Sequence, residues 1–394
     1  METLVLVGAS LIDGTGAEPV RGRAVVVEGG RIASVVDEAS APRGRRIALE
    51  GCTLLPGLIN CHVHLCLGAE ADPVRVLKDE PVALTALKAL LRAKQTVDAG
   101  VTTVRDLGGR EYVEFAVRRA VAEGLFPGPR ILAAGRPVCM TGGHGNWLGR
   151  EADGPDDARK AVREQLKAGA DVIKLIATGG VMTPGVEPGS PQLTLEEMRA
   201  AVEEARKAGR LAAAHAQGAS GIADAVEAGI TTIEHGIFLT DEIIASMKRK
   251  GVFLVPTLAA PAAISAGGLA AGIPDFMVRK SDAVIPHHIA SFQRAAKAGV
   301  RIAAGADSGT PLNVHGSLLP ELELMVKYGM TPLEAIRSAT SVAADALGLG
   351  GVTGRVVPGY SADLLAVAGQ PAERIGALAD VRLVLARGAI VTAP

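Results

Sequence analysis

Polar helical stretches alternate with short apolar runs along most of this chain. In each unit, a stretch rich in Ala, Lys and Glu leads to a glycine suited to a left-handed helix cap, and then to a short apolar segment that ends in a polar residue. Five stretches share this form: Val97–Asp106, Lys167–Lys174, Lys207–His215, Val226–His235 and Lys297–Asp307. This alternation predicts parallel βαβ units around a buried sheet.

The apolar runs predict eight strands in the middle of the chain. They span 55–62, 101–106, 130–134, 171–176, 211–215, 230–235, 252–256 and 301–306. Eight such units over about 300 residues favour an α/β fold of the (β/α)₈ or TIM-barrel type, with the polar strand ends at the mouth of the barrel. A doubly wound open sheet is the alternative, but one central mouth collects polar residues from so many strands better than a crevice does.

Both ends of the chain have a different pattern, with short strands and turn signals. We expect residues 1–54 and 355–394 to form one small β-sandwich domain beside a catalytic barrel of residues 55–354. The Ala- and Gly-rich segment Ala259–Ile273 is expected to be a mobile loop that covers the mouth.

Composition narrows the class of protein. The net charge of −1 gives no reason to expect a nucleic-acid partner or a membrane surface. No apolar stretch reaches the roughly 18 residues that a membrane-spanning helix needs. The segment Met1–Leu6 is typical of a first strand and lacks the features of a signal peptide. Four cysteines without a disulfide-like spacing fit a reducing cytoplasm, so we expect a cytoplasmic protein.

His62 and His64 form a His-x-His pair at the end of an apolar run. On a strand, such residues point to the same face, and two imidazoles can then bind one metal ion such as zinc. Lys174, His215 and His235 end other predicted strands, and Asp307 follows a further one. Each residue alone has a structural explanation, as a core histidine, an ion-pair partner or a helix cap. Together they predict a metal centre, because buried polar groups in one barrel mouth need compensation.

Cys61 and Cys66 flank the histidine pair and are further candidate ligands. The simpler interpretation is that they are small buried hydrophobic residues beside the site.

Several runs resemble the metal-dependent amidohydrolase superfamily: Leu55–His64, Ala213–Gly218, Ile233–Gly236, Ala304–Ser308 and, near the C-terminus, Thr353–Leu364. Within it, Ala170–Lys174 followed by Ala177–Gly180 is similar to the imidazolonepropionase-related branch. That branch contains Xaa-Pro dipeptidases, carboxypeptidases that act on N-acyl amino acids, and ochratoxinase-like amidases.

The resemblance implies two divalent metal ions, most simply Zn²⁺. His62, His64 and Asp307 would bind the more buried ion, and His215 and His235 the outer one. Lys174 would bridge both as a carbamate formed with CO₂, since a protonated ammonium cannot ligate. In the alternative, Lys174 is only a cation that balances carboxylates, and the site holds one metal.

The resemblance also implies a reaction. A hydroxide shared by the two metals would attack an amide carbonyl, Asp307 would act as general base and then as general acid, and His144 would bind the carbonyl oxygen. For His144, an ordinary position in a Gly-rich turn is the alternative. The expected substrate is a small molecule or dipeptide, with the amide bond next to a free carboxylate.

Substrate recognition would depend on the loops at the mouth. Trp147, the single tryptophan, is expected to line a pocket for an apolar group. The carboxylate would need a cation, for which the sequence offers five unranked candidates: Arg136, Arg150, His287, His288 and His315.

Two other functions are compatible with a metal barrel. One is a deaminase or a hydrolase of cyclic amides or imides, which the Lys174 motif disfavours because deaminase members usually use one metal and no bridging lysine. The other is a non-catalytic relative that assembles as a scaffold, which the presence of all six ligands disfavours. A homo-oligomer is compatible with either catalytic reading.

Overall fold

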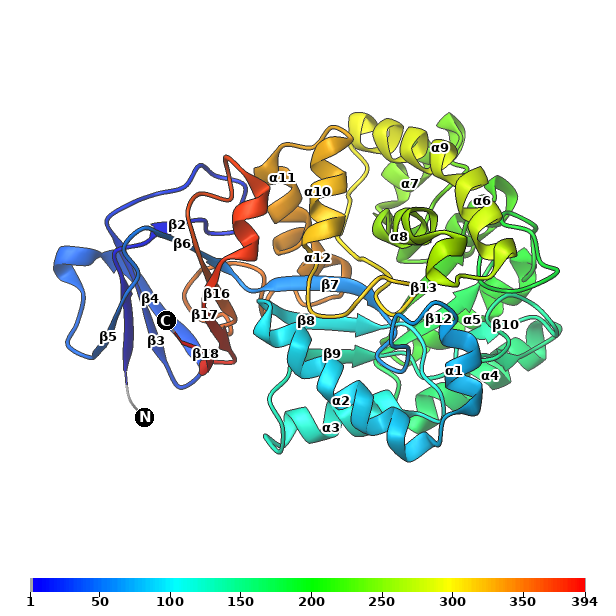
Figure 1. Ribbon diagram of the computed structural model, residues 1–394, viewed down its shortest axis with the longest axis horizontal. Coiled ribbons are helices and arrows are strands. Elements are labelled where there is room, and N and C mark those ends of the chain that lie inside the picture. The colour runs from blue at the N-terminus through cyan, green and yellow to red at the C-terminus, as the bar shows by residue number, and fades with distance from the viewer. Residues whose placement is uncertain (1–2, 394) are drawn as a thin grey trace.

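A computed structural model describes residues 3–393 of the chain. Met1 and Glu2, the start of the predicted first strand, lie outside the described residues, and strand β1 begins at Leu4. Seen in Figure 1, strands from both chain ends gather at one end of an elongated molecule, and the helices surround the parallel strands of the larger part. The chain is therefore a mixed α/β protein, as the sequence predicts.

Two sheets consist of parallel strands that the intervening helices connect. One has the order β7 (Leu58–Val63), β8 (Val101–Asp106), β9 (Arg130–Ala133). The other has the order β11 (Arg150–Glu151), β10 (Val138–Cys139), β12 (Val172–Ile176), β13 (Leu211–Ala216), β14 (Thr232–His235), β15 (Phe253–Val255). Their residues are almost all buried, as expected for parallel strands covered on both faces. Six of the eight predicted strands are confirmed within about two residues.

The helices follow the strands in the expected alternation. They are α1 (Pro73–Asp79), α2 (Val82–Asp98), α3 (Val113–Ala122), α4 (Pro155–Ala168), α5 (Leu195–Lys207), α6 (Ala219–Ala228), α7 (Asp241–Lys250), α8 (Ala259–Gly267), α9 (Asp275–Ala298), α10 (Leu319–Lys327), α11 (Pro332–Ser338) and α12 (Ser341–Ala346). A glycine in the left-handed conformation ends α4, α6 and α9, which is the helix stop that the sequence repeat predicts. Helix α7 ends in the same way at Gly251, which the repeat did not include.

The predicted strand 301–306 is wrong as a regular strand. The segment makes isolated bridges instead, from Ile302 to Leu254 of β15 and from Ser308 to Val63 of β7. The Cys61 amide also donates to Ala304 O at 2.9 Å. The regular ladders thus form two parallel sheets, between which this segment runs.

The predicted strand 55–62 is also corrected, because it is two strands. β6 (Cys52–Pro56) pairs with β16 (Leu364–Ala368), whereas β7 starts at Leu58 and pairs with β8. Gly57 separates them, and a Cβ atom at this position would lie only 2.2 Å from Thr102 Oγ1. A glycine is required here because the chain passes so close to β8.

The chain ends form two further sheets. One has the order β4 (Arg31–Asp37), β3 (Arg23–Glu28), β1 (Leu4–Val7), β5 (Arg45–Ala48), and the other β18 (Ala389–Thr392), β17 (Val381–Ala386), β16, β6, β2 (Ser10–Leu11). Leu6 and Val25 from the first sheet share one hydrophobic cluster with Leu54, Leu364 and Leu383 from the second.

The segment Ala259–Ile273 is not a plain loop. Helix α8 and the short 3₁₀ helix η2 (Leu269–Ala271) occupy most of it. The Leu258 and Ala259 amides, at the start of α8, donate to the carboxylate of the buried Glu321 at 3.0 and 2.7 Å. Ala-rich composition suggested a loop, but alanine is also the residue that favours a helix most.

Candidate metal centre

The polar residues singled out at the strand ends meet in one pocket. His62 belongs to β7, Lys174 to β12, His215 to β13 and His235 to β14. The remaining members follow strands or lie in loops. All of them line the same pocket: His62, His64, His144, Lys174, His215, His235 and Asp307. The structure therefore brings the six predicted metal ligands and His144 together around one pocket.

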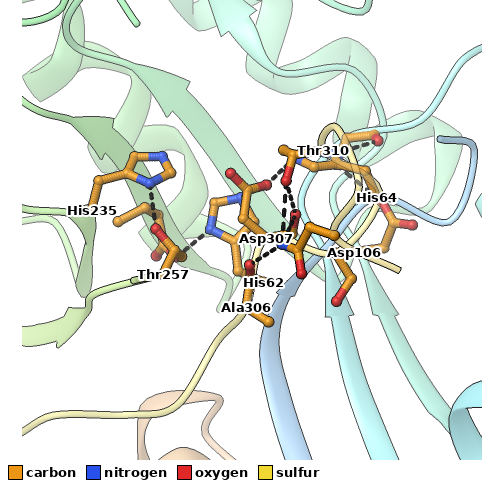
Figure 2. Close-up of polar contacts among 12 residues, drawn as sticks. His62, His64, Asp106, His235, Thr257, Ala306, Asp307 and Thr310 are labelled. Carbon is orange, nitrogen blue, oxygen red and sulfur yellow. Dashed lines mark hydrogen bonds and ion pairs between the residues drawn. The ribbon is translucent and has the colours of Figure 1, made fainter. Parts of the chain in front are cut away.

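Two imidazoles converge on one carboxylate oxygen. His62 Nε2 and His64 Nε2 lie 3.3 and 3.4 Å from Asp307 Oδ1, and this buried oxygen has no hydrogen-bond partner (Figure 2). His235 lies close by, so that one ligand atom each from His62, His235 and Asp307 falls within 4.8 Å of the others. An orphaned carboxylate oxygen among ring nitrogens fits a divalent cation, which would accept lone pairs from all of them.

The second nitrogen of each ring is held by an outer partner. These contacts are His62 Nδ1 to Glu234 Oε2 at 2.9 Å, His64 Nδ1 to Gly108 O at 3.0 Å, His215 Nε2 to Gly179 O at 3.0 Å and His235 Nδ1 to Thr257 Oγ1 at 2.7 Å. The carboxylate and carbonyl oxygens beside His62, His64 and His215 only accept, so the outward nitrogen of each of these three rings carries the proton. The inward nitrogen of each then has a free lone pair for a metal. The Thr257 hydroxyl can either accept from or donate to His235 Nδ1.

Lys174 is the second orphaned group. Its side chain is buried, and its Nζ has no hydrogen-bond partner among the described residues. Burial lowers the pKa of Lys174 to about 8, because an apolar environment disfavours the charged ammonium. A lysine in this position fits chemical modification or a partner charge better than a plain structural role.

The protonation states suit metal binding. Burial lowers the pKa of His62 to about 4 and that of His144 to about 3, and it holds the pKa values of His215 and His235 well below the usual range. For His64, burial acts in the same direction, but the neighbouring Asp307 carboxylate outweighs it and raises the pKa.

The pKa of Asp307 is lowered even though burial opposes this, because His62 and His64 lie beside the carboxylate. Near neutral pH the site thus presents an anionic carboxylate and mostly neutral imidazoles, which are the ligand forms that a divalent ion requires.

Backbone strain marks the same positions. His235, Thr257 and Asp307 have φ values of 72°, 55° and 57°, in the left-handed region that residues with a Cβ atom seldom adopt. Such conformations persist only where the surrounding structure imposes them, and they concentrate at functional sites.

Sequence reasoning missed the polar residues that support the ligands. The guanidinium of the buried Arg105 on β8 lies 2.8 Å from Glu234 on β14, and Arg105 Nε donates to Cys61 O at 2.7 Å. Asp106 accepts from the Leu65 amide at 2.8 Å and so holds the turn that carries His64. The sequence contains a sign of these residues, because two predicted strands end in the polar pairs Arg105-Asp106 and Glu234-His235. Only the alignment of the strands in the folded structure shows that Arg105 and Glu234 meet.

The predicted carboxylate-binding cations are mostly elsewhere. Arg136 Nη2 donates to Gly149 O at 2.7 Å, Arg150 pairs with Asp157 and Glu164, and His315 donates to Leu67 O. His287 contacts the ring of Phe238 outside the pocket.

Of the five candidates, only His288 lines the pocket, and its Nε2 donates to His235 O at 3.1 Å. The other four candidates are not among the residues that line the pocket.

Most of the remaining pocket wall is apolar. Trp147 lines it as expected, together with Leu107, Ile176, Val181, Met182, Ile237, Ile264 and Val284, the last two from helices α8 and α9. Two polar atoms of this pocket are buried without a hydrogen-bond partner and are not among the predicted ligands: Trp147 Nε1 and Gln217 Oε1.

The cysteines are not part of the centre. All four are free, and Cys61 and Cys66 lie in hydrophobic clusters. Burial raises the pKa of the Cys61 thiol to about 12, so this residue stays protonated. The simpler interpretation of the two flanking cysteines agrees with these contacts.

Comparison with known proteins identifies the family. Residues 53–391 match the model of the amidohydrolase family. The chain belongs to this family. Its members generally depend on metal ions, which agrees with the His62, His235 and Asp307 group.

Among its relatives is the ochratoxinase of Aspergillus niger, 32% identical over 410 residues that cover 95% of this chain and 82% of the relative. A solved Xaa-Pro dipeptidase with methionine bound in its active site is 32% identical, with a TM-score of 0.91 over 98% of this chain and 99% of that one.

A solved prolidase in complex with N-methylphosphonate-L-proline is 33% identical, with a TM-score of 0.92 and full coverage of both chains. This amidohydrolase is accordingly a hydrolase that acts on C–N bonds, and its chemistry is the hydrolysis of amide bonds. None of the helices within residues 3–393 combines the length and the apolar character needed to cross a membrane.

Proposed function

We propose that this amidohydrolase uses two divalent metal ions to hydrolyse an amide bond next to a free carboxylate, in a dipeptide or an N-acyl amino acid. The observation that carries the proposal is the convergence of His62 Nε2 and His64 Nε2 on the orphaned Asp307 Oδ1. This geometry disfavours a purely structural cluster, because a buried oxygen without a hydrogen bond costs free energy unless a ligand compensates it.

The proposal includes the arrangement of the chain. We infer that residues 55–354 form a (β/α)₈ barrel, whose regular ladders are completed by the bridges of the segment 301–308. Residues 1–54 and 355–394 would form a β-sandwich domain beside it, and the junction would lie at Gly57. The shared hydrophobic cluster of the two terminal sheets supports this assignment.

His62, His64 and Asp307 would hold the first ion, and His215 and His235 the second. Lys174 would contribute to both positions as a carbamate, formed when its neutral amine adds CO₂ and loses a proton, so that one negative charge shared by two oxygens replaces the ammonium. Its buried Nζ without a partner supports this role. We propose zinc for both positions, because imidazole nitrogens and carboxylate oxygens are typical zinc ligands.

When bound, the ions supply Lewis-acid chemistry, which acidifies a water molecule and polarises the amide carbonyl. Asp307 accepts the proton that the water loses and passes it to the leaving amine nitrogen. His144, whose ring lies 4.4 Å from that of His215, donates a hydrogen bond to the carbonyl oxygen.

The pocket supports an apolar substrate that carries one polar end. Its wall takes up an apolar acyl or N-terminal side chain, and the unpartnered Trp147 Nε1 and Gln217 carboxamide remain for the carboxylate. Amide oxygen and nitrogen have nearly the same shape, so the Gln217 side chain can turn to present its NH₂ group. The named ligands of the similar dipeptidase and prolidase structures, methionine and an L-proline derivative, agree with an amino acid at this end.

The test combines metal analysis with a substrate panel. Protein purified without chelator should contain close to two divalent ions per chain. It should cleave Xaa-Pro or Xaa-Leu dipeptides or N-acyl amino acids faster than their C-terminal amides. Full activity with one ion or fewer would overturn the two-metal centre. Activity confined to cyclic amidines or imides would instead support the deaminase or cyclic-amide alternative.

A further inference from the structure

The hydroxyl of Thr183 connects two loops at the pocket. Its Oγ1 lies 2.9 Å from His144 Nδ1, in the loop after β10, and it accepts a hydrogen bond from the Gly145 amide at 3.2 Å. Thr183 itself belongs to the long segment after β12 and is only 4% exposed. Within residues 3–393, these are the hydrogen-bond partners of this oxygen.

The hydroxyl has one hydrogen, and this decides where the proton of the His144 ring lies. If Thr183 donates to Nδ1, the hydroxyl hydrogen, the Gly145 amide and Nδ1 are all satisfied, and the ring proton is on Nε2. If Nδ1–H donates to Oγ1 instead, the buried hydroxyl hydrogen has no acceptor. A buried donor without an acceptor is disfavoured, because it has lost its hydrogen bond to water.

We propose that Thr183 is a positioning residue that holds His144 as the Nε2–H tautomer, so that Nε2–H donates to the substrate carbonyl oxygen. The inference rests on the proposed function for the role of that donor. The residue beside Nε2 supports this assignment. Gly180 has no side chain, whereas a Cβ atom at this position would lie 2.5 Å from His144 Nε2. Glycine at this position therefore keeps a side chain from covering that edge of the imidazole, and His144 lines the pocket.

Further hydrogen bonds hold the two loops that carry Thr183 and His144. The ammonium of Lys280 on α9, which is 8% exposed, donates to Thr183 O at 2.9 Å and to Val186 O at 2.5 Å. The Gln192 side chain accepts from the His144 amide at 3.0 Å. Both loops are therefore held against each other, and α9 anchors the one that carries Thr183.

The decisive measurement is the tautomer of His144 in the metal-loaded protein. The chain has eight histidines, so ¹⁵N-histidine labelling and long-range ¹H–¹⁵N correlation can resolve their rings. The His144 signal is assigned by its loss in His144→Asn. We expect the wild-type ring to show the Nε2–H pattern, and Thr183→Val, which keeps the shape but lacks the hydroxyl, to show a mixture of tautomers.

Kinetics supply the second readout. Thr183→Val should lower kcat about tenfold with KM within about twofold, because the carbonyl donor acts mainly in the transition state. Thr183→Ser should restore both kcat and the Nε2–H pattern. The matched control is Thr96→Val on α2. The buried Thr96 Oγ1 also donates a hydrogen bond, to Arg92 O. This control should leave kcat and the His144 tautomer unchanged.

An Nδ1–H or doubly protonated His144 ring in the wild type would overturn the inference, as would a Thr183→Val enzyme with the kcat of the control. Should Thr183→Val fail to fold, the wild-type and Thr183→Ser spectra still decide. An Nε2–H ring in a protein that cleaves no amide would support the tautomer assignment and overturn the proposed function.

Discussion

Arg105 and Glu234 form a buried ion pair between two different parallel sheets, with Arg105 Nη2 2.8 Å from Glu234 Oε1. The other carboxylate oxygen, Oε2, lies 2.9 Å from His62 Nδ1. One carboxylate thus joins the support of the fold to the orientation of a candidate metal ligand. A change in the pair should therefore alter both stability and metal binding.

The first prediction concerns stability. Arg105→Met leaves Glu234 buried without its cation, and it should lower the free energy of unfolding by about 3–5 kcal/mol. Urea denaturation of chelator-treated protein measures this. Arg119→Met removes an exposed partner of Glu123 and serves as the control, with a far smaller change expected. A loss in Arg105→Met no larger than in the control would contradict a supporting role for the pair.

The pH dependence of stability gives a second prediction. Burial tends to raise the pKa of Glu234, but the Arg105 guanidinium and His62 hold it at about 2, below the usual value of 4.5. Because the folded-state pKa lies below the unfolded one, the stabilisation is present above pH 4.5 and is lost as the pH falls towards 2.

Metal-free wild type should accordingly lose more stability across this window than Glu234→Gln, as followed by urea unfolding at a series of pH values. Parallel curves for the two proteins would mean that Glu234 is not an anion in the folded state.

The third prediction separates proton transfer from metal binding. Asp307→Asn keeps the shape and one ligating oxygen but removes the proton acceptor, so kcat should fall about a hundredfold or more. Elemental analysis should find the metal content unchanged. Asp345→Asn, which alters an ion pair with Arg355, is the matched control. Wild-type turnover in Asp307→Asn with both ions bound would assign the base to another residue.

The fourth prediction concerns substrate recognition by neutral groups. In Gln217→Leu or Trp147→Phe, the carboxylate of the substrate loses a donor. The ratio of kcat/KM for an acid to that for its C-terminal amide should then fall about tenfold or more, since a hydrogen bond to a charged group contributes about 1.5–3 kcal/mol. An unchanged ratio in both variants would place the carboxylate elsewhere in the pocket.

Local sequence pattern predicts most of the fold but not its irregular strands. A helix cap followed by an apolar run is a local signal, and it located β8, β12 and β13 correctly. The run 55–62 looks continuous because its apolar residues continue through Gly57, yet β6 and β7 pair with different sheets. The segment 301–306 is as apolar as the others, but its pairing consists of single bridges. Pairing is a property of distant segments, which local pattern does not contain.

In the candidate site, too, local pattern predicts some residues, whereas contacts between distant segments escape it. His62, His64 and Asp307 could be predicted as neighbours because strand ends of a barrel share one mouth. The contact of Arg105 with Glu234 joins residues 129 positions apart, and it depends on register across the interior. The partners of the candidate cations could not be predicted for a related reason. Arg150 forms ion pairs with Asp157 and Glu164 on the neighbouring helix α4, and these pairs depend on how the helix packs.

The left-handed backbone at His235, Thr257 and Asp307 has a consequence for how this protein can change over time. Each such residue keeps the folded chain about 1–2 kcal/mol above what a relaxed backbone would allow. Selection for heat resistance alone would therefore tend to replace these residues with glycine, and the chain would lose two proposed metal ligands, His235 and Asp307, while it gained stability. Relief of strain and retention of the proposed metal ligands His235 and Asp307 are thus opposing demands on the same backbone positions.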